Sequence, residues 1–283
     1  PKSIKLNVNI PSTLNYVYGD ATQLHQVLLN LVVNARDAMP KGGKLEIKVE
    51  NLLIDEYYAQ ANIHAKTGAY VVVTVADNGV GMHPEIQERI FEPFFTTKEV
   101  GKGTGLGLST ALSIVKSHGG FINVYSKLNK GTIVNIYLHI EPCEETNVYW
   151  CDESENFNGS GELILIVDDE PAIRKITKSS LEAYNYRVLT ASNGIEAIEI
   201  YTKYKQEINL ILLDMMMPEM DGETTIGVLQ KINAKVKIVA ISGLVFNYDS
   251  ASEDSLNVKA FMPKPFTGKD LLHTIAKVSR EFR

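Results

Sequence analysis

The residues best suited to chemistry in this sequence fall into two groups, and the first begins with an asparagine pair. Asn30 and Asn34 are four positions apart, which places both side chains on one face of a helix. A neutral amide oxygen can bind Mg2+ beside phosphate oxygens without adding negative charge. Taken alone, such a pair is also typical of a solvated helix surface, so its interpretation depends on the segments around it.

Two later segments extend this first group. Asp77 directly follows an apolar stretch, and a carboxylate at a strand end could accept a hydrogen bond from an exocyclic amine. Gly79 and Gly81 would let a flat ring approach the backbone, although an Asp-Asn-Gly sequence also forms simple turns. A glycine-rich stretch then opens a helical pattern, where exposed N–H groups can bind phosphate, although it would also fit a flexible loop. Its glycines are Gly101, Gly103, Gly105 and Gly107.

The second group consists of polar residues that follow short apolar stretches. Asp168 and Asp169 follow the first stretch, Asp214 the third, Ser242 the fourth and Lys264 the fifth. The carboxyl ends of parallel strands open onto one edge of a sheet, so these side chains are expected to meet there. Crowded carboxylates favour a hard divalent cation, and Lys264 would add a fixed positive charge for phosphoryl oxygens. An Asp-Asp pair alone is also typical of a turn or a helix cap.

The elements that must position the first group lie in residues 1–140. Period-two alternation predicts a strand from Ile4 to Ile10, and helical spacing predicts a helix from Asp20 to Met39. Further strands are expected at 44–52 and 70–76, a helix up to Lys116, and a hairpin of strands at 121–126 and 132–139. This order predicts an α/β sandwich without regular βαβ alternation.

The second group is positioned by residues 162–283, where strands and helices alternate. Apolar strands are expected at 163–167, 187–190, 210–213, 237–241 and 260–262. Short apolar strands between helices predict a parallel sheet covered on both faces. Pro265 after Lys264 could adopt a cis bond. Between the halves, residues 141–161 are acidic and polar and are predicted to form a flexible linker.

Composition excludes several classes of function. The net charge is −6 over 283 residues and no basic tract is present, which argues against nucleic-acid binding. No apolar run approaches the roughly 20 residues that a membrane helix needs. Cys143 and Cys151 match no zinc or redox spacing and are expected to be free thiols. Since the chain starts at Pro1, we expect it to be a cytoplasmic piece of a longer protein that could itself be membrane-anchored.

Four motifs in the first half together resemble the catalytic domain of sensor histidine kinases, within the superfamily that includes DNA gyrase and Hsp90. QVLLNLVVNARDAM (26–39) resembles the N box and DNGVGM (77–82) the G1 box. FEPFFTTK (91–98) resembles the F box and GKGTGLGLS (101–109) the G2 box. The resemblance covers about residues 1–140 and implies binding of ATP with Mg2+.

The resemblance also implies roles for individual residues. Asn34 would be the chief Mg2+ ligand, Asn30 would assist it, and Asp77 would bind the adenine amino group. Lys98 and Lys102 would lie near the phosphates. The remaining nucleotide-binding positions implied are Gly79, Gly81, Gly103, Thr104, Gly105, Leu106 and Gly107.

The second half strongly resembles the receiver domain of response regulators, with a flavodoxin-like doubly wound (βα)5 fold. The motifs are LILIVDDEP, LILLDMMMPEMDG, VAISG and FMPKPF. The resemblance implies that Asp214 is the phosphoacceptor and that Ser242 and Lys264 bind the phosphoryl group. Phe261 would occupy the aromatic switch position. The Mg2+ ligands implied are Asp168, Asp169, Asp214 and the carbonyl of Met216.

Together the two resemblances imply a phosphorelay enzyme cut from a hybrid sensor histidine kinase. Its phosphoacceptor histidine would lie on a missing or separate dimerisation domain, because no histidine of this sequence has a matching context. Two alternatives remain. A degenerate nucleotide-sensing module with a receiver as docking switch is opposed by the four intact boxes. A hydrolytic ATPase is opposed by Asn30, which stands where hydrolysing relatives carry a glutamate base.

Overall fold

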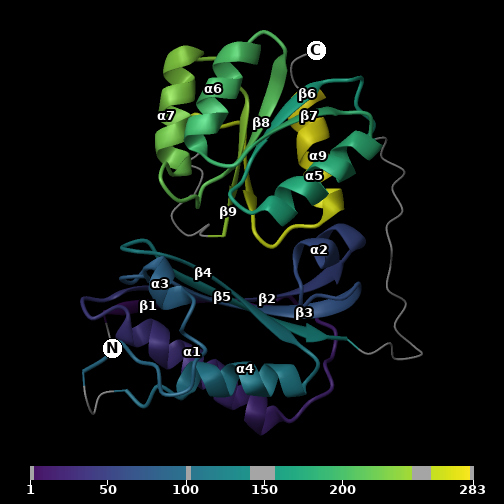
Figure 1. The fold of residues 1–283 in the computed structure, drawn as a ribbon. Helices are drawn as coiled ribbons and strands as arrows, with labels where there is room; N and C mark the ends of the chain where they lie inside the picture. Colours follow the sequence, from purple (N-terminus) through teal and green to yellow (C-terminus); the bar gives the residue numbers. More distant parts are fainter. Residues whose placement is uncertain (1–2, 100–102, 141–156, 244–255, 281–283) are drawn as a thin grey trace. The chain divides into compact units, whose positions relative to one another are not determined.

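The computed structural model describes residues 3–99, 103–140, 157–243 and 256–280 (Figure 1). The chain divides into two compact units, which are described separately. The first comprises Pro1–Ile54 with Thr67–Thr146, and the second Asp55–Lys66 with Asn147–Arg283. Among the described residues, no helix is long and apolar enough to cross a membrane.

The first unit is built on a mixed five-stranded sheet in the order β1-β2-β3-β5-β4 (Figure 1). β1 pairs in parallel with β2, whereas the other neighbours are antiparallel. The strands are β1 (Ile4–Asn9), β2 (Gly43–Ile54), β3 (Gly68–Asp77), β4 (Phe121–Lys127) and β5 (Gly131–His139). β3 is the central strand and ends at Asp77, so this carboxylate lies at the middle of one edge of the sheet.

Two helices, α1 (Ala21–Asp37) and α4 (Gly107–Ser117), pack side by side on one face of this sheet (Figure 1). Their apolar stripes form one core with the sheet, to which Val27 and Leu31 of α1 and Val115 of α4 contribute. Asp20 begins α1 by accepting hydrogen bonds from the N–H groups of Thr22 and Gln23, as an N-cap residue does. The helix pair therefore holds the asparagines and the glycine-rich stretch against one another.

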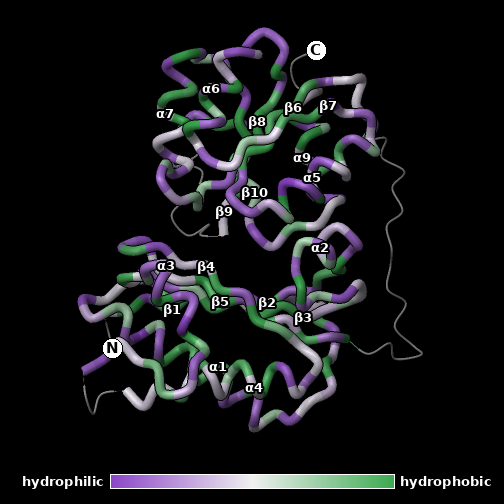
Figure 2. Tube along the Cα trace, viewed as in Figure 1, coloured by the Kyte–Doolittle hydropathy of each residue, from purple (hydrophilic) through white to green (hydrophobic). Residues whose placement is uncertain are grey.

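The second unit contains a fully parallel five-stranded sheet in the order β10-β9-β8-β6-β7. The strands are β6 (Leu163–Val167), β7 (Arg187–Ala191), β8 (Ile208–Asp214), β9 (Ile238–Ser242) and β10 (Ala260–Pro263). Figure 2 shows these strands as predominantly hydrophobic, as expected for a sheet buried on both faces.

Helices cover both faces of the second sheet. α5 (Pro171–Ala183) and α9 (Gly268–Arg280) pack on one face, and α6 (Gly194–Tyr204) and α7 (Gly222–Ile232) on the other. Adjacent residues of β6 alternate between the two cores, with Ile164 in one and Leu165 in the other. This is a doubly wound arrangement in which all five strands end on the same edge.

The predicted fold class is confirmed for both halves of the chain. Two short helices were not predicted: α2 (Glu56–Ala61), in the segment that groups with the second unit, and α3 (Pro84–Gln87). The first strand forms as predicted, but its alternating residues differ in burial: Ile4 packs on the core, whereas Leu6 and Val8 are exposed. Most of the predicted linker, including Cys143 and Cys151, lies outside the described residues.

Candidate functional site

A cavity of about 580 Å³ opens in the first unit between α1, the end of β3 and the glycine-rich stretch. Most of the residues that were predicted from the sequence to bind nucleotide line this cavity. The nominated residues that line it are Asn30, Asn34, Asp77, Gly81, Lys98, Gly103, Thr104, Gly105 and Gly107. Gly79 and Leu106 are not among the lining residues, and Gly101 and Lys102 lie outside the described part of the chain.

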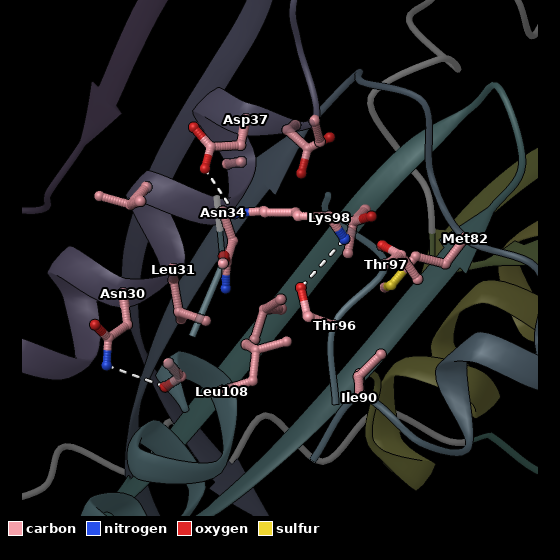
Figure 3. Close-up of a pocket in the computed structure, with 18 of the residues that line it drawn as sticks. Asn30, Leu31, Asn34, Asp37, Met82, Ile90, Thr96, Thr97, Lys98 and Leu108 are labelled. Atoms are coloured by element: carbon pink, nitrogen blue, oxygen red, sulfur yellow. Dashed lines mark hydrogen bonds and ion pairs between the residues drawn. The ribbon is translucent and has the colours of Figure 1, made fainter. Parts of the chain in front are cut away.

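The two asparagines of α1 differ in their surroundings (Figure 3). The side-chain amide of Asn30 donates a hydrogen bond to the carbonyl of Gly107 at 3.0 Å, and its oxygen accepts one from Gln26 at 2.9 Å. Asn34 lines the cavity one helical turn further along α1, where its amide could bind a cation or a phosphate. Asn30 therefore already joins α1 to the start of α4 in this structure.

Asp77 is almost completely buried at the end of β3, with 5% of its surface exposed. Its carboxylate accepts a hydrogen bond from the N–H of Gly79 at 2.8 Å. Burial raises the pKa of Asp77 to about 6, although the backbone hydrogen bonds from Gly79 and Thr132 oppose this rise. A buried carboxylate with unused acceptor capacity suits a ligand that brings its own donor, such as an exocyclic amine.

The loop after Asp77 follows a path that only glycine tolerates well. Gly81 has φ of 62°, and a side chain there would collide with the carbonyl of Lys127. Val80 in the same loop donates its N–H to the carbonyl of Ala38 at 3.0 Å. The loop is thus held between the end of α1 and the β4–β5 hairpin, which fixes the edge of the cavity.

The F-box segment and the glycine-rich stretch are joined by their backbones. Phe94 donates its N–H to the carbonyl of Gly105 at 2.9 Å, and both residues have positive φ, 69° and 66°. A side chain at Gly105 would collide with the backbone of Phe94. The two motifs, separate in sequence, therefore form one wall of the cavity.

The cavity has the donor set expected for a magnesium nucleotide. Asn34 offers an amide oxygen, Lys98 a positive charge and Asp77 a buried acceptor, and all three line the same space. Gly107 begins α4, and the nearest atoms to the position its Cβ would take, 3.8–3.9 Å away, belong to Asn30 and Asn34. The N-terminal end of a helix such as α4 favours an anion.

In the second unit, Asp168, Asp169 and Asp214 meet at the carboxyl edge of the sheet. One oxygen from each lies within 4.8 Å of the others. Lys264 reaches the same point, with its Nζ 2.7 Å from Oδ2 of Asp214. Burial, together with the charge of Asp214, raises the pKa of Asp168 to about 7, although Lys264 lowers it. The same two causes raise the pKa of Asp169.

This crowding of carboxylates indicates a cation site. Burial and the charge of Asp214 raise the pKa values of Asp168 and Asp169, so these carboxylates would gain from a neighbouring dication, and carboxylate oxygens are its preferred ligands. The residues present therefore fit Mg2+. Met216 lies beside them, and its N–H donates to Oδ1 of Asp214 at 2.9 Å.

The remaining receiver candidates lie at neighbouring strand ends. Ser242 is buried at the end of β9, and its carbonyl accepts a hydrogen bond from the N–H of Lys264 at 2.8 Å. The bond between Lys264 and Pro265 is cis, as the sequence suggested. Phe261 in β10 is partly buried against the core that α6 and α7 form with the sheet.

Several residues of the two sites were not nominated from the sequence. Asp37 lines the nucleotide cavity and binds Lys98, and its spacing of three from Asn34 could have revealed it. Arg174 donates to the carbonyl of Asp168 at 2.6 Å. Its position in the first turn of the helix after the acidic pair was the available signal.

Two known protein families match the chain, one in each half. Residues 19–142 match the family described as histidine kinase-, DNA gyrase B- and HSP90-like ATPase. Residues 164–276 match the response regulator receiver domain.

Individual proteins are also similar to this chain. Sensor kinase CckA of Brucella abortus is 37% identical over 98% of this chain and 30% of its own length. Sporulation kinase A of Bacillus subtilis is 42% identical over 43% of this chain and 17% of its own length. A receiver domain protein from Clostridium thermocellum has 27% identity and a TM-score of 0.40, covering 42% of this chain and 94% of that one.

The chain spans less than a third of the length of these two curated relatives. Along the chain, the match to the ATPase family comes first, over the unit with the cavity, and the match to the receiver family follows, over the unit with the acidic cluster. The chain therefore joins an ATP-binding domain of the histidine kinase, gyrase and HSP90 type to a response regulator receiver domain, as hybrid sensor kinases do.

Proposed function

We propose that this chain is the ATP-dependent and receiver part of a phosphorelay. The first domain transfers the γ-phosphoryl group of ATP to a histidine on a dimerisation or phosphotransfer domain, and Asp214 then takes it from that histidine. The observation that supports the proposal most is the acidic cluster of the second unit, in which Nζ of Lys264 lies 2.7 Å from Asp214. The same chain contains the cavity proposed to bind nucleotide. We assign the ATP-binding domain to residues 1–140, the linker to 141–161 and the receiver to 162–283.

In the nucleotide domain, each candidate residue has a role suited to its chemistry. Asp77 accepts the hydrogen bond of the adenine amine. Gly79 and Gly81 shape the loop beside the ring, because a Cβ at either position would collide with a backbone carbonyl, that of Ala38 or of Lys127. Asn34, assisted by Asn30, would hold Mg2+. Lys98 and Lys102 offset phosphate charge, while the backbone from Gly103 through Thr104, Gly105 and Leu106 to Gly107 surrounds the phosphates. Mg2+ would supply charge neutralisation at the β- and γ-phosphates.

Asn30 supports transfer to a protein residue rather than to water. Its amide cannot act as a general base, since it has no accessible protonation change near neutral pH. Both ends of this amide are also occupied, one by Gln26 and the other by the carbonyl of Gly107. The chain therefore lacks the group that would activate water at this position.

In the receiver, the nucleophile is a carboxylate oxygen of Asp214. The transfer forms the bond between this oxygen and phosphorus and breaks the bond between phosphorus and the histidine nitrogen. Lys264 and Ser242 bind phosphoryl oxygens. Asp168, Asp169, Asp214 and the carbonyl of Met216 would hold Mg2+, which would offset the charge of the incoming group.

A reconstituted relay tests the proposal. The chain would be incubated with Mg2+, γ-labelled ATP and a separately expressed histidine-bearing dimerisation domain of a related sensor kinase. Label should appear first on the added domain in an acid-labile form, and then on the receiver in a hydroxylamine-labile form. Asp214→Asn should stop the label at the histidine, and Asn34→Ala should prevent both steps.

Two results would count against the relay. Release of inorganic phosphate from ATP without any label on the added domain would indicate a hydrolytic ATPase. Label that reaches the receiver of the Asp214→Asn chain would place the acceptor elsewhere.

A further inference from the structure

The cavity contains an ion pair between two segments that are distant in sequence. Nζ of Lys98, in the F-box segment, lies 2.6 Å from Oδ2 of Asp37, the last residue of α1 (Figure 3). The side chains of Lys98 and Asp37 are 34% and 28% exposed, so water screens the pair only in part. Both residues line the nucleotide cavity. The lysine expected to meet phosphate is therefore bound to a carboxylate in this structure.

The carboxylate of Asp37 is held in place by its second oxygen. Nε and the terminal nitrogen of Arg36 donate to Oδ1 at 2.9 and 2.7 Å, which leaves Oδ2 for Lys98. Burial raises the pKa of Asp37, but the hydrogen bonds from Lys98 and Arg36 outweigh it, so the pKa lies below its ordinary value. Asp37 is thus ionised at neutral pH and attracts Lys98 with a full charge.

The position of Lys98 is coupled to the glycine-rich stretch. A Cβ at Gly103 would lie 2.7 Å from Oγ1 of Thr96 and 3.2 Å from Cδ of Lys98, so the glycine backbone packs directly on the lysine stem. The N–H of Lys98 also donates to Oγ1 of Thr96 at 3.2 Å. A lysine that moves away from Asp37 would therefore shift the backbone that rests on it.

We propose that Asp37 is a positioning residue that holds Lys98 on α1 until nucleotide phosphates take the lysine from it. The proposal rests on the proposed function, because it requires a nucleotide in this cavity. An ammonium group whose charge is already paired with Asp37 attracts phosphate less strongly, so phosphates must compete with this carboxylate for the lysine. Asp37 thereby sets the affinity for nucleotide and, through Lys98, supports the backbone at Gly103.

A double-mutant cycle on the full chain separates this role from its rivals. Dissociation constants for MgATP would be measured by calorimetry for the wild type, Asp37→Asn, Lys98→Met and the double variant. Asp37→Asn should lower the dissociation constant about two- to five-fold, the scale of a partly exposed ion pair. In the Lys98→Met background the same change should have a clearly smaller effect, since no lysine is left to release. Asp37→Ala should behave as Asp37→Asn.

Three outcomes would overturn the proposal. Weaker MgATP binding by Asp37→Asn, with metal-free ATP binding unaffected, would make Asp37 a metal ligand. If Asp37→Asn raised the affinity for MgATP equally with and without Lys98, Asp37 would act only by repelling phosphate. If Asp37→Asn left the affinity unchanged, Asp37 would have no part in nucleotide binding. If the wild-type chain binds no MgATP at all, the proposed function fails and this inference fails with it.

A second readout needs no nucleotide. In Asp37→Asn, hydrogen exchange at residues 103–107 should be several-fold faster than in the wild type, because their support on Lys98 is loosened. Glu50→Gln is the matched control: it removes the same charge from an ion pair with Lys48 at 2.8 Å, outside the cavity. It should change neither the exchange nor the dissociation constant, and unchanged exchange in Asp37→Asn would contradict the coupling.

Discussion

Asp77 is proposed to give the cavity its selectivity for nucleotide, through a carboxylate that is nearly shielded from water. In the proposed complex this carboxylate accepts a hydrogen bond from the adenine amine. Guanine places a carbonyl oxygen at that point, which an ionised carboxylate repels. Asp77→Asn replaces one acceptor oxygen by a donor, so it should reduce the preference for ATP over GTP by at least ten-fold. Competition binding measures the preference, and an unchanged ratio would remove Asp77 from base recognition.

The raised pKa of Asp77 gives a pH signature with a definite sign. A pKa of about 6 in the folded protein, above its ordinary value, means that folded chains hold the proton more tightly. This group therefore favours folding below about pH 4, and its contribution is lost as the pH rises through about 6. Asp77→Asn should stabilise the nucleotide-free protein at pH 8, by on the order of 2 kcal/mol, and hardly at pH 4. Thermal unfolding at both pH values checks this, and an equal shift at both would contradict it.

Asn34 is predicted to act through metal. Asn34→Ala should weaken MgATP binding at least ten-fold while leaving metal-free ATP binding nearly unchanged, because only the amide ligand is lost. Calorimetry with and without a chelator gives the two dissociation constants. An equal loss under both conditions would mean that Asn34 contacts nucleotide or supports the fold instead.

At the scale of elements, two hydrogen bonds join α1 to the two ends of α4. His118, after α4, accepts the N–H of Asp20 at 3.0 Å, and its other nitrogen lies 2.8 Å from the carbonyl of Ile114. Asn30 makes the second hydrogen bond, to Gly107 at the start of α4. These contacts keep the N-box helix and the G2-box helix in register around the cavity.

Removing the first hydrogen bond should loosen the start of α1. His118→Ala leaves the N–H of Asp20 without its imidazole acceptor and should cost about 1 kcal/mol. Native-state hydrogen exchange of the α1 amides is the measurement. His25→Ala removes an exposed histidine from the same helix and should have no effect. Equal protection in the two variants would show that the contact contributes nothing.

The elements with strong periodicity were predictable, because burial on one face imposes the pattern. The helical spacing of Val27 and Leu31 is realised in α1, and the continuous apolar runs of the second half became its parallel strands. Helices α2 and α3 were missed, since six and four residues carry too little periodicity to be recognised. The exposure of Leu6 could not be predicted. Alternation shows which residues of a strand share one face of the sheet, but it does not show whether another element packs on that face.

At the scale of the whole molecule, the site residues were predictable where motifs place them at strand ends and helix starts. The parallel sheet brings Asp168, Asp214 and Lys264 together by topology alone. The pairing of Lys98 with Asp37 could not be foreseen in the same way. It joins positions 61 residues apart and depends on how the F-box segment folds over α1.

Asp214 is proposed to receive a phosphoryl group in a site that supplies its own catalytic groups. Incubation with acetyl phosphate and Mg2+ tests this. The acyl–phosphate bond breaks, acetate leaves, and a new bond forms between phosphorus and a carboxylate oxygen of Asp214. Mass spectrometry of the full chain should show one added phosphoryl group. Asp214→Asn should abolish it because an amide is a far weaker nucleophile, and Asp169→Ala should abolish it through loss of metal. Full labelling of the Asp214→Asn chain would contradict the assignment.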